Sequence, residues 1–327
     1  MQNIRINTKT NLFNMLALTD LYNHCDYCPR ACGVNRQAGE TGYCGETADL
    51  RVGVAVIHRG EEPPLIGAGG SGTIFITGCN LGCVFCQNYQ VSQGEGKVAP
   101  FHGAAPLGKT VSTEEFAGIC AALRDAGAEN INIVTGSHAV PAIIEGFIAA
   151  RKAGVQIPLL WNSSGYDSLE ALEILKDHVE IYLPDLKTLD SKLAVKFFNA
   201  PDYPAVASAA ILKMIETAEN KVIIRHLILP GHLESTRSVL RWFADNAKGR
   251  ALLSLMTQYT PIPGIGKKAP NRYVVKEEYD IVLRWLEEFG IEDGFCQELV
   301  TGNEWLPDFR RKNPFPSKLS VPVYTIY

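Results

Sequence analysis

Short apolar runs alternate with amphipathic segments over most of the chain after residue 70. The runs are rich in Ile, Val and Leu and are continuous rather than alternating, which is typical of strands buried on both faces of a parallel sheet. Strands are therefore expected at residues 73–77, 130–135, 157–162, 179–184, 221–229 and 251–257, with a seventh candidate at 294–299. One further β-prone run, residues 51–58, precedes them.

Helix signals occupy the segments between these runs. Ser112 and Glu115 have the spacing of a capping box, and the helical pattern that follows them ends at Gly127. Pro141 lies early in the next pattern, where a helix tolerates proline, and a third pattern, 168–177, begins with a good cap. Repeated strand–helix units of this kind predict an α/β fold, either a barrel or a doubly wound sheet.

The pattern changes near residue 70, so three parts are expected. Residues 1–70 form a small cysteine-rich N-terminal module, residues 71–300 form the α/β core, and residues 301–327 form a C-terminal extension. The tail after Trp305 holds four prolines and is expected to wrap the surface.

Composition excludes several classes of protein. The chain of 327 residues is 46% hydrophobic and 20% charged, which suits a globular core. Its 31 basic and 35 acidic residues lack the basic excess of a nucleic-acid-binding protein. No apolar run approaches the roughly 20 residues that span a bilayer, and the N-terminus lacks the apolar segment of a secretory signal. Seven of the nine cysteines fall between positions 25 and 86, which favours a cytoplasmic metalloprotein.

Three of these cysteines form a compact motif directly after the first core strand. Cys79, Cys83 and Cys86 have the spacing C-x3-C-x2-C at the carboxyl end of that strand, where α/β folds hold their chemistry. Three thiolates can bind three irons of a 4Fe–4S cluster and leave the fourth iron open to another ligand. A structural zinc site usually has four protein ligands in a closed tetrahedron, so the trio fits zinc poorly.

The motif, with Phe85 before its last cysteine, resembles the signature of the radical S-adenosylmethionine (SAM) superfamily. The chain also resembles the activating enzymes of glycyl radical enzymes, such as the pyruvate formate-lyase activase, through LPDLK at 183–187 and IIRHLILPG at 223–231. CPRACGVNR and GETGYCG, together with GCNLGCVFCQN, resemble a branch of activase-related proteins with an N-terminal cysteine-rich module. The similarity covers about residues 20 to 310.

This resemblance implies a fold and a reaction. The fold would be a partial (β/α)6 barrel. The open iron of the 4Fe–4S cluster would bind the amino and carboxylate groups of SAM, and one electron from a flavodoxin- or ferredoxin-type donor would cleave SAM to a 5′-deoxyadenosyl radical. The radical would abstract hydrogen from a protein or peptide substrate, and no nucleic-acid or membrane partner is expected.

The same resemblance carries over SAM contacts near the cluster and after the third strand. Phe85 would pack beside the adenine as well as in the core, and Gln87 and Asn88 follow the cluster loop. Asn162 and Ser163 begin a segment that resembles Asp-Thr-Asn-Gly-aromatic of the activases. The Asp of that segment helps to bind a monovalent cation in some members, and Asn162 replaces it here.

The segment after the second strand departs from the family. Many members have Gly-Gly-Glu there, which holds the SAM amino group, whereas this chain has Thr135, Gly136, Ser137 and His138 and no acid. Thr135, Ser137 or backbone carbonyls would substitute, with His138 as a hydrogen-bonding group.

The last three core strands supply the remaining contacts. Asp185 and Lys187 alternate along the chain and so share a face, where the lysine would meet the SAM carboxylate and the aspartate would orient it. Arg225 would face the same carboxylate, since its planar fork suits bidentate binding, and His226 would point to the other face and pack. Tyr259 occupies the region where the activases have a histidine near the adenosine, and it would stack on or hydrogen-bond to it.

The N-terminal module has its own group of four thiols, with the spacing C-x2-C-x3-C-x11-C, at Cys25, Cys28, Cys32 and Cys44. Residues 20–50 contain too little apolar matter to fold unaided, so a metal would supply their stability. A structural zinc site and an auxiliary iron–sulfur cluster both stay open, and two disulfides are disfavoured by the expected compartment. Cys120 and Cys296 are interpreted as small packing residues.

Three functions follow from these patterns. The first is a radical SAM enzyme that abstracts hydrogen from a glycine of a partner protein, supported by the activase-like segments. The second is a radical SAM enzyme that modifies a different peptide or a small molecule, supported by the four extra cysteines and the missing Gly-Gly-Glu. The third is a non-catalytic iron–sulfur electron carrier, which the three-cysteine motif with its open iron disfavours.

Overall fold

The structure, a computed structural model, describes residues 17–92, 107–218, 221–262 and 268–327. Its strands are β1 (Arg51–His58), β2 (Ser71–Ile76), β3 (Lys109–Thr110), β4 (Ile131–Val134), β5 (Leu159–Ser163), β6 (Ile181–Pro184), β7 (Ile223–Leu227), β8 (Leu252–Met256), β9 (Gly294–Cys296) and β10 (Ser320–Thr325). Its α-helices are α2 (Pro63–Ile66), α3 (Tyr89–Ser92), α4 (Thr113–Asp125), α5 (Val140–Lys152), α6 (Leu169–Leu175), α7 (Ser191–Phe198), α8 (Tyr203–Ala218), α9 (Leu233–Asn246) and α10 (Lys276–Glu288). Two 3-10 turns, η1 (Leu18–Asn23) and η2 (Arg36–Ala38), lie in the N-terminal module.

The strands form two sheets that continue one another. The larger has the order β10-β1-β2-β4-β5-β6, with β3 beside β1, and the smaller has the order β7-β8-β9. Pairing is parallel from β2 to β6 and from β7 to β9. Parallel bridges between Tyr182 and Val222 and between Asp185 and Arg225 join the sheets. The result confirms the expected partial (β/α)6 barrel, with β2, β4, β5, β6, β7 and β8 as its strands.

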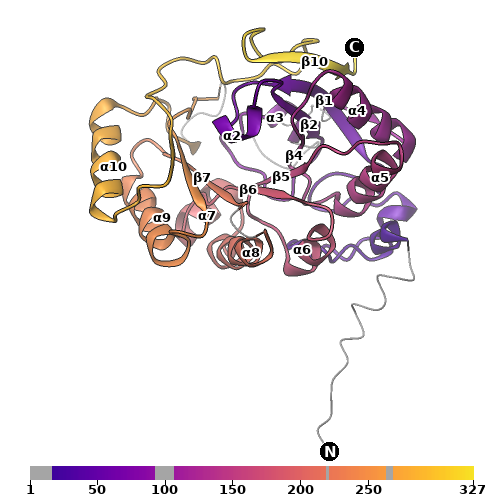
Figure 1. Ribbon diagram of the computed structural model, residues 1–327. Coiled ribbons are helices and arrows are strands. Elements are labelled where there is room, and N and C mark those ends of the chain that lie inside the picture. Colours follow the sequence, from indigo (N-terminus) through magenta and orange to yellow (C-terminus); the bar gives the residue numbers. More distant parts are fainter. Residues whose placement is uncertain (1–16, 93–106, 219–220, 263–267) are drawn as a thin grey trace, which may run out of the picture.

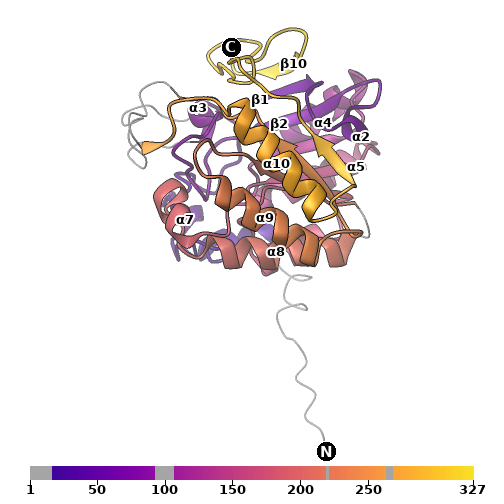
Figure 2. The ribbon, with the colours of Figure 1, turned by 90° about the vertical axis from the view of Figure 1, so that its left-hand side faces the viewer.

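The helices cover the outer side of this curved sheet. Figure 1 shows α4, α5, α6, α8, α9 and α10 around the strands, and Figure 2 shows α10 packed along α9. The capping box of α4 is present, because the Ser112 side chain accepts from the Glu115 amide and the Glu115 carboxylate accepts from the Ser112 amide. Ser168 caps α6 in the same way, by accepting from the Ala171 amide. No helix in the described ranges is both long and apolar enough to cross a bilayer.

Every apolar run that was expected to be a strand contains one. Strands β2, β4 and β5 are buried along almost their whole length, as continuous Ile, Val and Leu runs predict. The run at 51–58 is also a strand, β1, and it pairs antiparallel with β2 across the expected boundary at residue 70. The three-part division of the chain therefore stays a prediction, with one sheet running through its first boundary.

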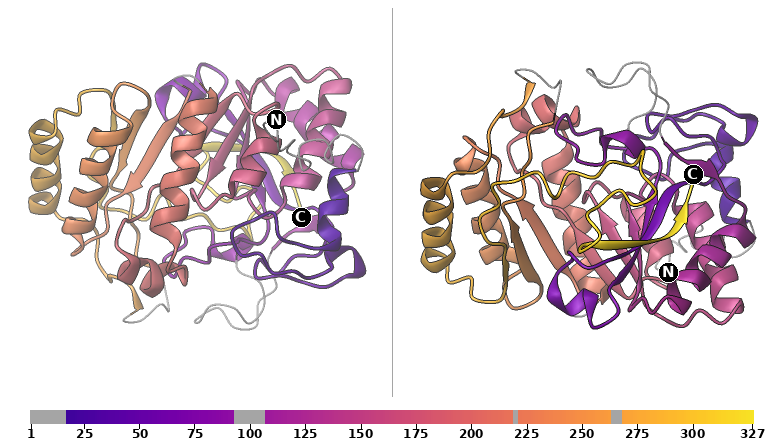
Figure 3. Two further views of the ribbon diagram at one scale, coloured as in Figure 1. Left: turned by 90° about the horizontal axis from the view of Figure 1, so that it is seen from below. Right: turned by 90° about the horizontal axis from the view of Figure 1, so that it is seen from above.

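The C-terminal extension does more than wrap the surface. Residues Ser320–Thr325 form β10, which pairs antiparallel with β1 and adds an edge strand to the large sheet. Phe309 is buried against Phe75 of β2, with ring centroids 5.1 Å apart. Figure 3, seen from above, shows the extension running across the sheet. The sequence did not predict this strand because it contains Pro322. Proline occurs within sheets mainly at edge strands, so it weakens the signal of a strand.

We expect Phe309→Ala to lower the free energy of unfolding by about 3 kcal/mol, because it removes a buried aromatic ring and leaves a cavity. Chemical denaturation followed by circular dichroism measures the change. Val321→Thr, on the exposed side of β10, is the matched control and should stay within about 0.5 kcal/mol of the parent. Equal stability of the two variants would show that the extension does not contribute to the core.

Candidate functional site

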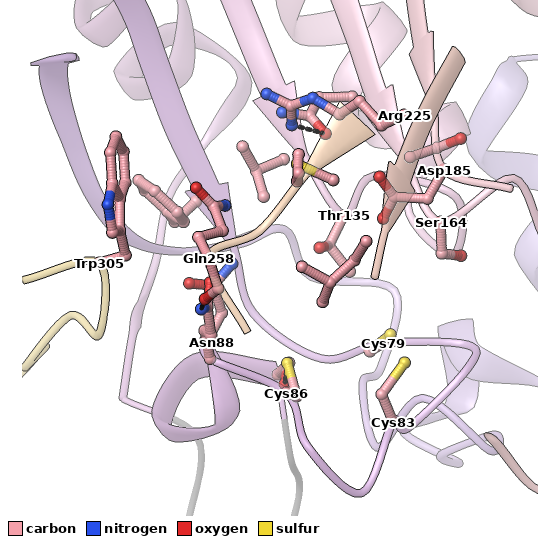
Figure 4. A pocket seen from close by; sticks show the side chains of 18 of the residues that line it. Cys79, Cys83, Cys86, Asn88, Thr135, Ser164, Asp185, Arg225, Gln258 and Trp305 are labelled. Atoms are coloured by element: carbon pink, nitrogen blue, oxygen red, sulfur yellow. Dashed lines mark hydrogen bonds between the residues drawn. The ribbon is translucent and has the colours of Figure 1, made fainter. Parts of the chain in front are cut away.

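One pocket lies at the carboxyl ends of the parallel strands (Figure 4). Parallel strands end at the same edge of a sheet, so residues far apart in sequence meet there. Most of the residues predicted to bind SAM or the cluster line this pocket: Cys79, Cys83, Phe85, Cys86, Gln87, Asn88, Thr135, Ser163, Asp185, Lys187 and Arg225.

The cysteine loop follows β2 and turns at two glycines. Gly78 and Gly82 have φ values of 77° and 78°, which L side chains rarely adopt. A methyl group on Gly78 would also lie 2.5 Å from Cγ of Glu46. Within the loop the amide of Leu81 donates to Sγ of Cys79 at 3.3 Å. The loop is therefore folded tightly, with its thiols directed to the pocket (Figure 4).

The donor set of this loop fits a 4Fe–4S cluster. Burial raises the pKa of the Cys86 thiol to about 11 and that of Cys83 further, and the three thiols interact electrostatically with one another. Among the described side chains, no three His, Cys, Asp or Glu groups are arranged as a site for a single metal ion. In a cluster each thiolate binds a different iron, so the sulfur atoms lie farther apart than around one ion.

Thr135 holds an unusual backbone conformation beside this loop. Its φ is 65°, a value that is an outlier for a β-branched residue, and its amide donates to the carbonyl of Asn162 at 3.0 Å. Residues in strained conformations concentrate at functional sites. Thr135 lines the pocket together with Ser163, the last residue of β5, and Ser164, which lies beside Thr135 in Figure 4.

Asp185 and Lys187 share the pocket face, as their alternation predicts. Their side chains form an ion pair that is about one-fifth exposed. Burial disfavours the Lys187 ammonium, but the Asp185 carboxylate outweighs this, and the pKa of Lys187 is raised. The hydroxyl of Tyr203 accepts from the Lys187 amide at 2.9 Å and lies 2.8 Å from the carbonyl of Asp185, which fixes the backbone between them. A charged ammonium is thus held ready for an anionic group.

Arg225 lines the pocket but is already paired. Its Nε donates to Glu62 at 2.9 Å, its Nη2 forms an ion pair with Glu61, and its Nη1 donates to Oδ1 of Asn162 at 3.3 Å. Neither glutamate was expected at the site from the sequence. They follow β1 in a loop rich in proline and glycine, and their sequence signal is a pair of acids three residues after the end of a buried strand.

Four residues predicted to contact SAM do not line the pocket. Tyr259 donates its hydroxyl to the carbonyl of Pro270 at 2.8 Å and packs on Phe85, and Gln258 lines the pocket in its place. The other three belong to the segment after β4: Gly136, Ser137 and His138. They are buried because this segment turns away from the pocket after Thr135.

These three residues hold the loop instead. A methyl group on Gly136 would lie 2.5 Å from Cη2 of Trp161, and Ser137 hydrogen-bonds to the buried Asp167. Nε2 of His138 bonds to the carbonyl of Thr77 at 2.7 Å, just before the cysteine loop. The segment after β4 is therefore tied to the end of β2.

The remaining histidine and cysteine predictions concern packing. His226 is buried outside the pocket, bonded to the carbonyl of Leu186 and to the Thr236 hydroxyl, and burial lowers its pKa to about 4. Its prediction as a packing residue is confirmed. Cys120 is fully buried in α4 as expected, whereas Cys296 is exposed on β9 and accepts from the Tyr279 hydroxyl at 3.7 Å.

The four N-terminal thiols lie near one another. Burial is the largest cause that raises the pKa of the Cys28 thiol to about 12, and the charges of the other three thiols add to it. No disulfide joins any of the nine cysteines, all of which lie in the described ranges. The amide of Tyr43 donates to Sγ of Cys32 at 3.2 Å. Among the described residues these thiols are not arranged as a site for a single metal ion, so a metal here and its identity stay a prediction.

Arg30, between the N-terminal cysteines, clamps the cluster loop. Its Nε donates to the carbonyl of Asn80 at 2.7 Å and its Nη2 to that of Leu81 at 3.2 Å. Its Nη1 donates to the carbonyl of Asn199 at 2.8 Å, and its guanidinium stacks on the ring of Tyr43, 3.7 Å from the centroid. One side chain of the N-terminal module thus bonds two backbone carbonyls of the cysteine loop.

Arg36 makes a second connection from the N-terminal module to the pocket. It is almost fully buried, and its Nη1 donates to the carbonyl of His138 at 2.6 Å and to the hydroxyl of Tyr27 at 2.7 Å. Tyr27 also donates to the carbonyl of His138. The module therefore holds both loops that border the candidate cofactor site.

Comparison with known proteins identifies the family. The profile of the radical SAM superfamily matches residues 73–243, just over half of the chain. The chain belongs to the radical SAM superfamily. The match runs from β2 into α9, so it contains the cysteine triad and the strand ends up to Arg225. Membership implies SAM and a 4Fe–4S cluster as cofactors of this radical SAM protein.

One relative is similar in sequence over most of the chain. An uncharacterized protein of Methanocaldococcus jannaschii is 30% identical over 276 residues, which cover 84% of this chain and 77% of that protein.

Two solved structures are also similar. SuiB of Streptococcus suis bound to the precursor peptide SuiA has 15% identity and a TM-score of 0.49 over 67% of this chain and 46% of that chain, so this chain spans less than half of SuiB. A domain of a pyruvate-formate lyase-activating enzyme from Bacteroides vulgatus has 16% identity and a TM-score of 0.38 over 48% of this chain and 91% of that one.

We expect Arg30→Met to weaken the cluster loop, since it removes the hydrogen bonds that hold the carbonyls of Asn80 and Leu81. Reconstituted protein should lose iron several-fold faster under a chelator, measured by iron content against time. Arg30→Lys should recover little, because one ammonium cannot reproduce the guanidinium fork. Arg284→Met, at an exposed position of α10, is the control, and equal iron loss in both Met variants would contradict the clamp.

Proposed function

We propose that this radical SAM protein is an enzyme that binds a 4Fe–4S cluster through Cys79, Cys83 and Cys86 and abstracts hydrogen from a protein or peptide, as activating enzymes do. When bound, the 4Fe–4S cluster and SAM would supply the radical chemistry that removes a hydrogen atom from the substrate, with the electron coming from a flavodoxin- or ferredoxin-type donor. The expected compartment is the cytoplasm, where thiols stay reduced.

A single observation carries this proposal. The three cysteines of the radical SAM motif share one pocket with a charged lysine, a paired aspartate and hydroxyl groups from two neighbouring strands. The pocket therefore offers a cluster site and, within the same cavity, groups of the kind that bind the zwitterionic end of an amino acid.

The residues of the pocket have separate tasks in this proposal. Lys187 binds the SAM carboxylate, and Asp185 keeps its ammonium charged and aligned. Thr135 offers hydroxyl and carbonyl oxygens to the SAM amino group in place of the missing glutamate, whereas the hydroxyl of Ser163 is already bonded to Asp167 at 2.6 Å and to the amide of Gly165 at 3.1 Å. Phe85, packed between Phe197 and Phe198 of α7, keeps water from the cysteine side of the pocket.

Two substrate classes are carried forward. The activase-like segments at 183–187 and 223–231 favour a glycine of a partner protein, which would become a glycyl radical. The N-terminal module, whose Arg30 and Arg36 contact the two loops beside the cofactor site, favours a different peptide or a small molecule. The non-catalytic electron carrier is the alternative outside this class, and it predicts no cleavage of SAM.

Release of 5′-deoxyadenosine tests the proposal. Protein reconstituted anaerobically with iron and sulfide, then mixed with SAM and a reductant, should form 5′-deoxyadenosine, measured by chromatography. Cys83→Ala should abolish this product, because the cluster loses one of its three thiolates. Cys296→Ala, outside the pocket, is the matched control and should retain the parent rate. A fully loaded, reduced sample that releases no 5′-deoxyadenosine would exclude both enzyme functions.

Metal analysis tests the N-terminal site separately. We expect the reconstituted protein to hold metal beyond the roughly four irons of one cluster, either about one zinc or about four more irons. Cys44→Ala should lose this excess and keep the iron bound at the triad. Elemental analysis of both proteins measures the difference. A parent protein with about four irons and no further metal would overturn the second site.

A further inference from the structure

The end of the pocket away from Cys83 has a different chemistry from the cofactor side. Figure 4 shows Arg225 and Trp305 there, across the cavity from the cysteines. The walls at this end include Glu61, His58 and three aromatic rings, those of Phe75, Trp305 and Phe315. The radical SAM function proposed above assigns no role to Glu61 or to the aromatic rings.

Negative charge exceeds positive charge at this end. Asp185 and Lys187 balance each other on the cofactor side. Glu61 and Glu62 share one partner, Arg225, and the two carboxylates are 7% and 6% exposed. One buried negative charge is therefore left without a counter-charge, which is costly in a low-dielectric site unless a cation binds.

His58 does not supply the missing positive charge. Its Nδ1 lies 3.9 Å from Glu61, but it accepts a hydrogen bond from the amide of Gly60 at 3.2 Å, so this nitrogen carries no proton. Burial also lowers the pKa of His58 below its ordinary value. The ring stays neutral and packs edge-on against Phe315, with centroids 4.9 Å apart.

There are also fewer hydrogen-bond donors than acceptors around Glu61. The amide nitrogen of Asn132 donates to Glu61 at 3.1 Å and to the Ser71 hydroxyl at 3.2 Å. The oxygen of the same fully buried amide has no partner among the described residues. Asn132 does not line the pocket, so the Glu61 carboxylate is the acceptor of this pair that a positively charged N–H donor in the pocket would meet.

Close packing fixes the position of the Trp305 side chain at this end of the pocket. Gly60 lies under the indole, since a methyl group there would be 2.7 Å from Cζ3 of Trp305 and 2.9 Å from Cε1 of His58. Indole faces attract ammonium and guanidinium groups through the ring quadrupole. A carboxylate and a tryptophan in one pocket form a pair of groups suited to a cationic side chain.

We propose that Glu61 and Trp305 form a subsite for a positively charged side chain of the substrate, that of a lysine or arginine residue in a peptide. This inference rests on the proposed function and narrows its substrate class. The cationic side chain would occupy the end of the pocket away from the cysteines, and the atom that loses hydrogen would lie between it and SAM.

Binding of matched peptides tests the subsite. The reconstituted, full-length protein with SAM is titrated by calorimetry with three blocked pentapeptides that carry lysine, acetyl-lysine or glutamate between glycines. The lysine peptide should bind on the order of tenfold tighter than the acetyl-lysine peptide, because charge-assisted hydrogen bonds are about twice as strong as neutral ones. Equal binding of the lysine and acetyl-lysine peptides would overturn the subsite.

Substitutions at Glu61 and Trp305 test whether these two residues cause the preference for the lysine peptide. Glu61→Gln should erase the preference for lysine while the affinity for SAM stays the same, and Trp305→Leu should reduce it several-fold. Glu304→Gln, an exposed neighbour paired with Lys318, is the control and should keep the parent preference. An equal loss of SAM affinity in Glu61→Gln would assign this carboxylate to SAM and refute the proposal.

Two further measurements keep the outcomes separate. Iron content and circular dichroism show whether Glu61→Gln is folded, and if it is not, Trp305→Leu alone decides, with an unchanged lysine preference counting against the subsite. Formation of 5′-deoxyadenosine without any peptide reports on the proposed function alone. Failure of the radical chemistry and failure of the subsite are thus distinguishable.

Discussion

Parallel strand pairing is the constraint on which the site depends. The pairs β2–β4, β4–β5 and β5–β6 run in one direction, so the segments after these strands emerge at one edge of the sheet. The bridge between Asp185 and Arg225 extends this edge to β7. Residues at the ends of β2, β4, β5, β6, β7 and β8 thereby contribute to one pocket, and none of these segments forms a cofactor site alone.

The charged side chains of that pocket form one balanced ion pair and one group with an excess of negative charge. Lys187 and Asp185 neutralise each other next to the cysteines, while Arg225 is shared by two glutamates at the other end. The amide oxygen of Asn162 faces Arg225, at the position where some activases have a cation-binding aspartate. The guanidinium of Arg225 therefore occupies the space next to Asn162.

Patterns along the sequence predicted the parts of the structure that depend on residues close together in the chain. Continuous apolar runs predicted the barrel strands, and the Ser112–Glu115 spacing predicted the start of α4. The alternation of Asp185 and Lys187 placed both on one face. Resemblance to the family added the cluster motif, because three cysteines at that spacing have few other uses.

Contacts between distant segments could not be predicted in the same way. Arg30 and Leu81 are 51 residues apart, and Arg225 and Glu62 are 163 apart, so no pattern along the chain connects them. Tyr259 was expected at the adenosine, but the chain direction after β8 places Gln258 at the pocket instead. The edge strand β10 was missed because proline and a short length weaken a strand signal.

The pairing of β10 with β1 has a consequence for the order in which the protein becomes complete. The two strands are separated by more than 250 residues of sequence, and Trp305 and Phe315 precede β10. A nascent chain that has emerged from the ribosome only as far as α9 already contains the cysteine triad and the N-terminal thiols, but it lacks this wall of the pocket. Synthesis therefore leaves an interval in which the end of the pocket away from the cysteines is open, and this wall is added last.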